Sequence, residues 1–198
     1  MRPGPRTAEA PERPADAVMI GERVYLRALE TTDAALLRRA ANDPQVRTTF
    51  FTNYPANLAQ QEDVIRRLYQ DRTTLLLAVC TREPDGRAVG VTGFHRIDWV
   101  GRMATFSLII ADPDAWGRGF GSEATRLMIE YGFDVLNFHR IQLHVFDGNE
   151  AAKRIYKKAG FREEGRLREA MVQNGRWHDF LVMGLLEDEW REVNRRRD

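Results

Sequence analysis

The feature that most constrains the fold is a strand that passes through a glycine-rich turn directly into an amphipathic helix. Residues 103–110 are apolar and typical of a strand, and the turn that follows contains Gly117, Gly119 and Gly121. From Gly119 onward apolar residues recur with a period of 3.6, which predicts a helix with one apolar face. We expect Phe120, Ala124, Leu127, Met128, Tyr131 and Val135 on that face, and Glu123, Arg126, Glu130 and Asp134 on the polar face. Such a helix packs back against the sheet that its strand belongs to.

The remaining segments extend this unit to a larger sheet with helices on both faces. Alternating apolar and polar residues predict strands, and longer periodic runs after capping residues predict helices. Strands are expected at 23–27, 74–81, 88–98, 103–110, 140–145, 161–167 and 177–186. Helices are expected from Thr32 or Asp33 to Asn42, from an opening at residues 55–57 through Leu68, from 119 to 135 and from 150 to 159. Pro44 is expected to block continuation of the first helix. This order predicts an α+β fold built on a mixed sheet of about seven strands.

Length and composition indicate one ordinary globular domain. The chain has 198 residues and a net charge of +1, with basic and acidic residues interleaved, so nucleic-acid binding is not expected. Residues 1–18 are rich in proline and charge and predict a flexible tail, followed by a single domain over residues 19–198. No apolar run is long enough to span a membrane, which favours the cytoplasm. Cys80 is the only cysteine and is expected to be a buried thiol, and no metal site is expected.

The glycine turn has the chemistry of an anion site. Glycines let the backbone turn with its N–H groups pointing inward, and the helix N-terminus adds roughly half a positive charge, so phosphate oxygens are favoured there. The plain alternative is a tight turn that merely starts a helix. A Walker A sequence is missing, and Ser122 stands where a dinucleotide fingerprint needs its third glycine. Both features argue against a nucleoside triphosphate or NAD site.

The turn resembles the acetyl-CoA loop of GNAT acetyltransferases, Arg/Gln-x-x-Gly-x-Gly/Ala, with Gly119 and Gly121 on the two small positions. Trp116 stands where that pattern has Arg or Gln, but the stretch is similar to the variant Trp-Gly-Lys/Arg-Gly-x-Gly-x-Glu-Ala of RimJ/RimL-type members. The resemblance implies the GNAT fold, with a twisted and mostly antiparallel sheet. It also implies an acetyl-CoA site formed by Leu108, Ile109, Ile110, Trp116, Gly117, Arg118, Gly119, Phe120, Gly121 and Ser122.

A second segment, residues 145–161, resembles the GNAT signature Asn-x-x-Ala-x-x-x-Tyr-x-x-x-Gly-Phe. Its Asn149, Ala152 and Tyr156 lie at i, i+3 and i+7, on one helix face. The resemblance implies that all three contact the cofactor and that Tyr156 protonates the departing thiolate. A phenol of pKa ~10 can donate to a thiolate of pKa ~8.5. The alternatives are an N-cap role for Asn149, which is compatible with cofactor contact, and a purely structural Tyr156.

The resemblance implies direct attack of a neutral amine on the thioester, with a backbone N–H between Ser107 and Ile110 binding the oxyanion. Many relatives carry a glutamate in the fourth strand as the base, whereas residues 102–108 contain no carboxylate. We take His95 as the candidate base, although a strand histidine is more often structural. Asp98, His178 and Asp179 are the other candidates.

The acceptor is less well defined by the sequence. Residues 164–170 and 174–186 are similar to the closing hairpin of the RimJ/RimL group, which favours a small-molecule primary amine or a peptide N-terminus. A polyamine, an aminoglycoside, or a silent acyl-CoA-binding module are the alternatives. In relatives the acceptor lies between the first helices and the hairpin, and the matching aromatic residues are Phe50, Phe51, Tyr54 and Trp177. Glu30, Asp33, Asp98 and Asp179 are the carboxylates that could form a polyamine-binding cluster. The sequence leaves a monomer and a homodimer open.

Overall fold

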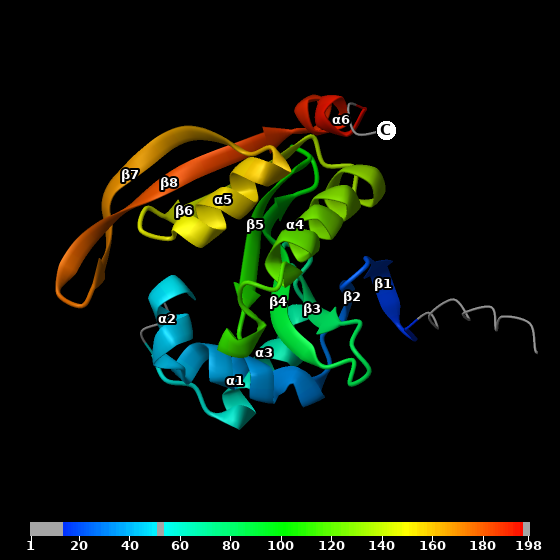
Figure 1. Cartoon of the computed structure of the whole chain (residues 1–198), viewed down its shortest axis with the longest axis vertical. Coiled ribbons are helices and arrows are strands. Elements are labelled where there is room, and N and C mark those ends of the chain that lie inside the picture. The colour runs from blue at the N-terminus through cyan, green and yellow to red at the C-terminus, as the bar shows by residue number, and fades with distance from the viewer. Residues whose placement is uncertain (1–13, 51–53, 196–198) are drawn as a thin grey trace, which may run out of the picture.

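A computed structural model describes residues 14–50 and 54–195, and these form one open sheet of eight strands in the order β1-β2-β3-β4-β5-β6-β8-β7 (Figure 1). The strands are β1 (Ala17–Ile20), β2 (Val24–Ala28), β3 (Leu75–Thr81), β4 (Ala88–Asp98), β5 (Met103–Ile110), β6 (Arg140–Phe146), β7 (Arg162–Gln173) and β8 (Arg176–Leu186). The helices are α1 (Ala34–Asn42), α2 (Pro44–Phe50), α3 (Leu58–Leu68), α4 (Phe120–Glu130), α5 (Glu150–Ala159) and α6 (Glu187–Arg195). The expected α+β architecture, a mixed and mostly antiparallel sheet with helices, is confirmed.

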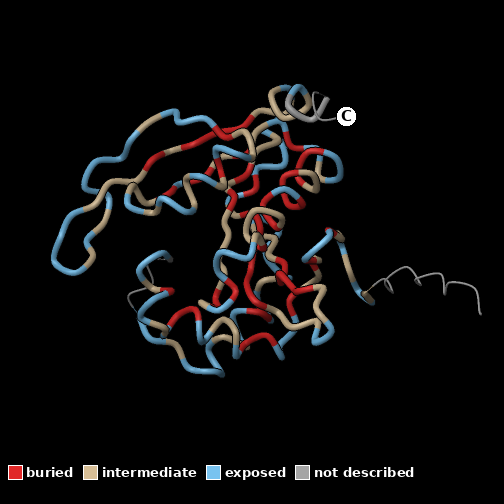
Figure 2. The backbone as a smooth tube through the Cα atoms, in the orientation of Figure 1, coloured by how far each residue is buried: buried red, intermediate tan, exposed pale blue. Residues whose placement is uncertain are grey.

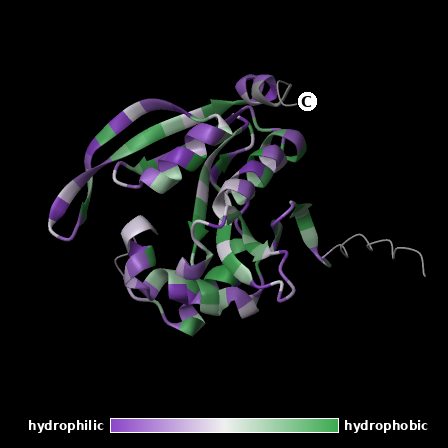
Figure 3. Ribbon diagram, in the orientation of Figure 1, coloured by the Kyte–Doolittle hydropathy of each residue, from purple (hydrophilic) through white to green (hydrophobic). Residues whose placement is uncertain are grey.

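Helices cover both faces of the sheet, as expected. On one face, Ala78 and Cys80 of β3 pack against Ile65 of α3, so the single cysteine is a core thiol. On the other face the alternate residues Leu77 and Val79 belong to a larger cluster, which α4 and α5 cover. The buried segments concentrate where these layers meet (Figure 2), and the central strands carry mostly hydrophobic residues, whereas α6 is hydrophilic (Figure 3). In the part of the chain that the structure describes, no helix is long and apolar enough to cross a membrane.

The centre of the sheet contains its one parallel pair, β5 with β6, and this pair is short. Only Met103–Thr105 of β5 pair with Arg140–Gln142 of β6. Every other neighbouring pair among the described strands is antiparallel. Beyond Thr105 the strands diverge, so the rest of β5 has no strand partner on that side. A sheet that opens at its centre exposes backbone hydrogen-bonding groups to whatever lies between the strands.

The N-terminal edge differs from the expectation. Strand β1 begins at Ala17 and pairs with β2, so the expected start of order near Met19 moves two residues toward the N-terminus and the sheet gains a strand. Four residues are too few for a periodic pattern to be recognised in the sequence. Of the expected tail, residues 1–13 lie outside the described residues.

Two helix details also differ. Pro44 ends α1, as expected, but it also begins α2, because the first turn of a helix needs no N–H from proline. Val135, expected on the apolar face, is 61% exposed, because the helix passes into a π-turn at Tyr131 and its period changes there.

Candidate acyl-CoA site

The turn between β5 and α4 holds two glycines in the left-handed conformation, Gly117 with φ +72° and Gly119 with φ +85°. A Cβ on Gly117 would meet open space, so the backbone angle alone accounts for glycine there. Gly119 is the N-cap of α4 and supplies no side-chain cap. The first N–H groups of α4 are therefore left to bind another acceptor, and a phosphate is a suitable one.

Two side chains expected to contact the cofactor are committed to the protein. The indole N–H of Trp116 donates to the carbonyl oxygen of Ile110 at 2.9 Å and so ties the turn back to the end of β5. The guanidinium of Arg118 forms an ion pair with Glu83 and lies over the ring of Phe120, 4.8 Å from its centroid. The side chains of Trp116 and Arg118 therefore stabilise the turn itself.

The open edge of β5 presents backbone groups of alternate residues. The N–H of Ala111 donates to Val89 of β4, so the backbone groups of Ser107 and Ile109 also face β4. The backbone groups of Leu108 then face the gap toward β6. By the same alternation the N–H of Ile110 faces this side too, so Leu108 and Ile110 have the suitable N–H groups among the residues expected to bind the oxyanion, and Leu108 is the nearer of the two to Phe106 in the strand. The side chain of Ile109 packs toward α1 and α2 instead, against Ala40 and Val46, on the opposite face from α4.

Helix α5 places Tyr156 beside this edge. The side-chain oxygen of Asn149 accepts from the N–H of Ala152 at 3.0 Å, so its N-cap role is confirmed, and Ala152 packs against the core. The ring of Tyr156 meets those of Phe106 and Phe161 edge to face at 6.0 Å. Burial raises the pKa of Tyr156 to about 12, so this phenol stays protonated at neutral pH.

The Tyr156 hydroxyl forms no hydrogen bond with the described residues, although no fully buried side-chain nitrogen or oxygen among them lacks a partner. The oxygen must therefore border accessible space. The start of α4 meets β5 and α5 at Gly121, where a Cβ would be 3.4 Å from Leu108 Cδ2 and 3.5 Å from Ile155 Cδ1. Tyr156 follows Ile155 on α5, and its ring packs on Phe106 of β5, two residues before Leu108.

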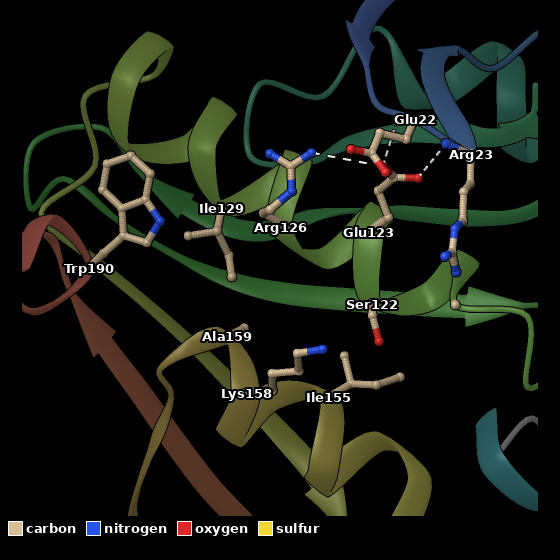
Figure 4. A pocket seen from close by; sticks show the side chains of 11 residues that line it. Glu22, Arg23, Ser122, Glu123, Arg126, Ile129, Ile155, Lys158, Ala159 and Trp190 are labelled. Atoms are coloured by element: carbon tan, nitrogen blue, oxygen red, sulfur yellow. Dashed lines mark hydrogen bonds and ion pairs between the residues drawn. The ribbon is translucent and has the colours of Figure 1, made fainter. Parts of the chain in front are cut away.

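A pocket of about 600 Å³ borders the same turn on the outer side of α4 and α5 (Figure 4). Its size suits a small-molecule ligand. Gly119 and Ser122 line it from the start of α4, and Ile155 and Lys158 line it from α5. Arg23, from the turn between β1 and β2, lies at the edge nearest Gly119. Arg23 and Lys158 carry no signal for this site in the sequence, because only the tertiary fold brings them to the glycine turn.

His95 belongs to β4, and its side chain lies on the other face of the sheet from Tyr156. Its Nε2 is 2.8 Å from the Oγ of Ser107, and side chains alternate along the strand, so this pair lies opposite Phe106 and Tyr156. Burial and the charge of Arg96 lower the pKa of His95, which therefore is neutral at pH 7 and can accept a proton.

The other candidate bases are held in structural roles. Asp98 accepts from the N–H groups of Val100 and Gly101 in its own turn. The N–H of Glu169 and the guanidinium of Arg166 lower the pKa of Asp179, which makes it a weak base. The ring of His178 packs on that of Phe146 at 4.9 Å. Of the four candidates, His95 is the one whose side chain is hydrogen-bonded to a side chain of β5, the hydroxyl of Ser107.

The expected acceptor side is only partly described. Gln173 near the end of β7 donates to the backbone oxygen of Arg47 in α2 at 3.4 Å, so the hairpin and the first helices do meet. Tyr54 and Trp177 are 84% and 63% exposed. Phe51 lies outside the described residues, as does the side chain of Phe50.

Comparison with known proteins agrees with this geometry. The family model of the acetyltransferase (GNAT) domain matches residues 23–162. The chain is 28% identical over 171 residues to the spermidine N(1)-acetyltransferase of Vibrio cholerae, covering 86% of this chain and 97% of that relative. It is 30% identical over 178 residues to the putative ribosomal N-acetyltransferase YdaF of Bacillus subtilis, covering 86% and 95%.

A solved structure supports the same assignment. The crystal structure of Vibrio cholerae spermidine N-acetyltransferase in complex with CoA and spermine matches with a TM-score of 0.79 and 28% identity, covering 85% of this chain and 98% of that one. Fold, site and relatives together define an N-acetyltransferase that uses acetyl-CoA. The chain belongs to the GNAT acetyltransferase family.

Proposed function

We propose that acetyl transfer takes place at the gap between β5 and β6, with Tyr156 on one face of the sheet and His95 on the other. Acetyl-CoA supplies the acetyl group as a thioester. The residues at the gap fit it: the uncapped start of α4 suits the pyrophosphate, and the unpaired edge of β5 suits the amides of the pantetheine arm. The divergence of β5 and β6 on the strand that packs against Tyr156, whose hydroxyl borders accessible space, is the observation that carries this proposal.

Each residue then has one task. The Leu108 N–H donates to the carbonyl oxygen as negative charge develops on it. Tyr156 donates its hydroxyl proton toward the departing sulfur. His95 accepts the proton of the attacking amine through the Ser107 hydroxyl, which lies 2.8 Å from its Nε2. Because the amine must be neutral to attack, a neutral histidine on the acceptor face favours the reaction.

The cofactor placement is tested by Gly121→Glu. A Cβ on Gly121 points between Leu108 and Ile155, so a glutamate there adds bulk and negative charge where the cofactor is expected. We expect acetyl-CoA binding, measured by calorimetry, to be abolished. Gly165→Glu is the matched control, because a side chain at Gly165 meets open space. Unchanged affinity in a folded Gly121→Glu protein would exclude this placement.

For the acceptor, we infer a compact primary amine or a peptide N-terminus. Three of the four carboxylates that could hold a polyamine are committed: Asp33 to a paired contact with Arg27 at 2.7 and 2.9 Å, Asp98 to its own turn and Asp179 to Arg166. Exposed ion pairs contribute only ~0.2 to 1 kcal/mol each, so a polyamine needs several free carboxylates together.

The polyamine remains the second candidate, because a relative of similar length is a spermidine N(1)-acetyltransferase. The two candidates differ in a direct measurement. We would compare kcat/KM for spermidine, short peptides and simple monoamines at one pH and one ionic strength, following release of free thiol. A hundredfold preference for spermidine would overturn our assignment. The same assay separates an enzyme from a silent acyl-CoA-binding module.

A further inference from the structure

The turn between β1 and β2 is fastened to the first turn of α4 by one carboxylate. Glu123 Oε1 accepts from the N–H of Glu22 at 2.7 Å, and its Oε2 accepts from the N–H groups of Arg23 and Val24 at 2.8 and 3.0 Å (Figure 4). The Glu123 side chain is only 12% exposed, although the sequence pattern places it on the polar face. A charged acceptor in three such bonds holds the turn firmly.

The sequence of the turn allows this close approach. A Cβ on Gly21 would lie 2.6 Å from the carboxyl carbon of Glu123, so a side chain there would displace the carboxylate. Arg82 fixes the turn from the opposite side, donating from its guanidinium to the Gly21 oxygen at 2.9 Å and from its N–H to the Arg23 oxygen at 2.8 Å. The backbone of Arg23 is thereby held from two directions.

The Arg23 side chain extends from this turn to the glycine turn. Its Nη1 donates to the carbonyl oxygen of Arg118 at 3.2 Å and lies 2.6 Å from the position that a Cβ on Gly119 would take. Glycine at 119 therefore permits the left-handed backbone angle and also leaves space for the Arg23 guanidinium. Within the described part of the chain no carboxylate pairs with Arg23, whereas Arg118 pairs with Glu83.

Arg23 places a cationic side chain at the glycine turn, where the sequence of this chain departs from the general GNAT pattern. The general GNAT loop pattern has Arg or Gln where this chain has Trp116, and the Trp116 indole is bound to Ile110. The glycine turn thus lacks a cationic or amide side chain of its own at that position. A guanidinium that lies beside Gly119 from a different strand supplies a donor with the planar geometry that suits phosphate oxygens.

We propose that Arg23 is a cofactor-binding residue that donates to the pyrophosphate of acetyl-CoA, and that Glu123 is the positioning residue that holds it at the glycine turn. The inference rests on the proposed cofactor placement. Arg23 is exposed, so solvent partly screens its contact with the pyrophosphate, and its contribution to the binding free energy is modest.

The first test measures binding by calorimetry for Arg23→Ala. We expect about five- to tenfold weaker binding of both CoA and 3′-dephospho-CoA, since both carry the pyrophosphate, and unchanged binding of pantetheine, which carries no phosphate. Arg23→Lys should retain part of the affinity. Arg67→Ala, which removes another exposed charge from α3 on the other side of the sheet, is the control and should bind CoA normally.

Two outcomes would overturn the assignment. A loss with CoA that disappears with 3′-dephospho-CoA would place Arg23 at the ribose phosphate instead. Unchanged CoA affinity in Arg23→Ala, together with abolished binding in Gly121→Glu, would refute the role of Arg23 and leave the cofactor placement standing. Normal binding in Gly121→Glu would remove the placement itself.

The second test separates positioning from general stability by a double-mutant cycle. Glu123→Gln keeps one acceptor oxygen and should weaken CoA binding severalfold while lowering the melting temperature. If Glu123 acts through Arg23, the substitution should cost no further affinity in an Arg23→Ala background, although the melting temperature still falls. Gly21→Ala, which displaces the same carboxylate, provides a second route if Glu123→Gln does not fold. Fully additive losses of affinity would overturn the positioning role.

Discussion

Removal of the Tyr156 hydroxyl tests the proposed chemistry most directly, because the structure separates its effect on catalysis from its effect on stability. The hydroxyl forms no hydrogen bond with the described residues, and the ring keeps its contacts with Phe106 and Phe161 in Tyr156→Phe. We therefore expect the free energy of unfolding to change by less than about 0.5 kcal/mol, as for a substitution that removes no contact.

The size of the catalytic effect follows from the pKa. With the pKa of Tyr156 at about 12 and that of a free thiol at ~8.5, complete transfer of the proton to a thiolate is unfavourable by roughly 5 kcal/mol. The phenol therefore acts mainly by a hydrogen bond to the charge that develops on sulfur. Hydrogen bonds to charged groups contribute ~1.5 to 3 kcal/mol, which corresponds to a loss of roughly 10- to 150-fold in kcat.

The assay should separate rate from affinity. We would measure kcat by release of free thiol at saturating amine, and acetyl-CoA affinity by calorimetry, for Tyr156→Phe and for Tyr131→Phe as the matched control. Tyr131 is half-buried against the same core cluster and lies outside the proposed site. The expected result is a fall of about 10²-fold in kcat with nearly unchanged affinity, in Tyr156→Phe alone. Full activity in that variant would refute the proton-donor role.

Three further predictions follow from the same contacts. His95→Gln should lower kcat by about tenfold or more and remove the acidic limb of its pH profile, because general base catalysis is lost. Since the folded state keeps the pKa of His95 below its reference value of ~6.5, stability is present above that pH and falls below it, and His95→Gln should flatten this fall in urea titrations. Trp116→Phe removes the bond to Ile110 and should cost about 1 kcal/mol of unfolding free energy in the same titrations, with weaker acetyl-CoA binding. Asn149→Ala removes the N-cap of α5 and should cost ~1 kcal/mol, whereas a thermal melt unchanged from the wild type would contradict the capping bond.

The sequence predicts those parts of the molecule that depend on local signals. The bounds of β5 and α5 agree with the expectation, because each element carries its own period and its own end signals, Gly160 for α5 among them. The glycine turn and Tyr156 are also local, since each belongs to a segment with a recognisable spacing. Their resemblance to GNAT signatures leads to the correct fold and class of reaction.

The parts that the sequence did not predict depend on contacts between distant segments. Glu123 has the spacing of a solvent-facing residue on α4, and its burial follows only from the N–H groups of a turn 101 positions earlier. The committed side chain of Arg118 has the same explanation, because its partner Glu83 lies 35 positions earlier and becomes a neighbour only through the tertiary fold. A motif predicts where a backbone turns more reliably than it predicts the partners of its side chains.

The divergence of β5 and β6 is compatible with two opposite proposed roles on one strand, a hydrogen-bond donor on one face and a proton acceptor on the other. Tyr156 lies on the face of β5 that carries Phe106, and His95 with Ser107 lies on the other face. An acid and a base that met directly would share one proton. Separated by the strand, the two can meet only through the gap that opens beyond Thr105. Burial also shifts their pKa values in opposite directions, upward for Tyr156 and downward for His95. Each group is thereby held at neutral pH in the protonation state that its proposed role requires, and both are uncharged before substrate binds.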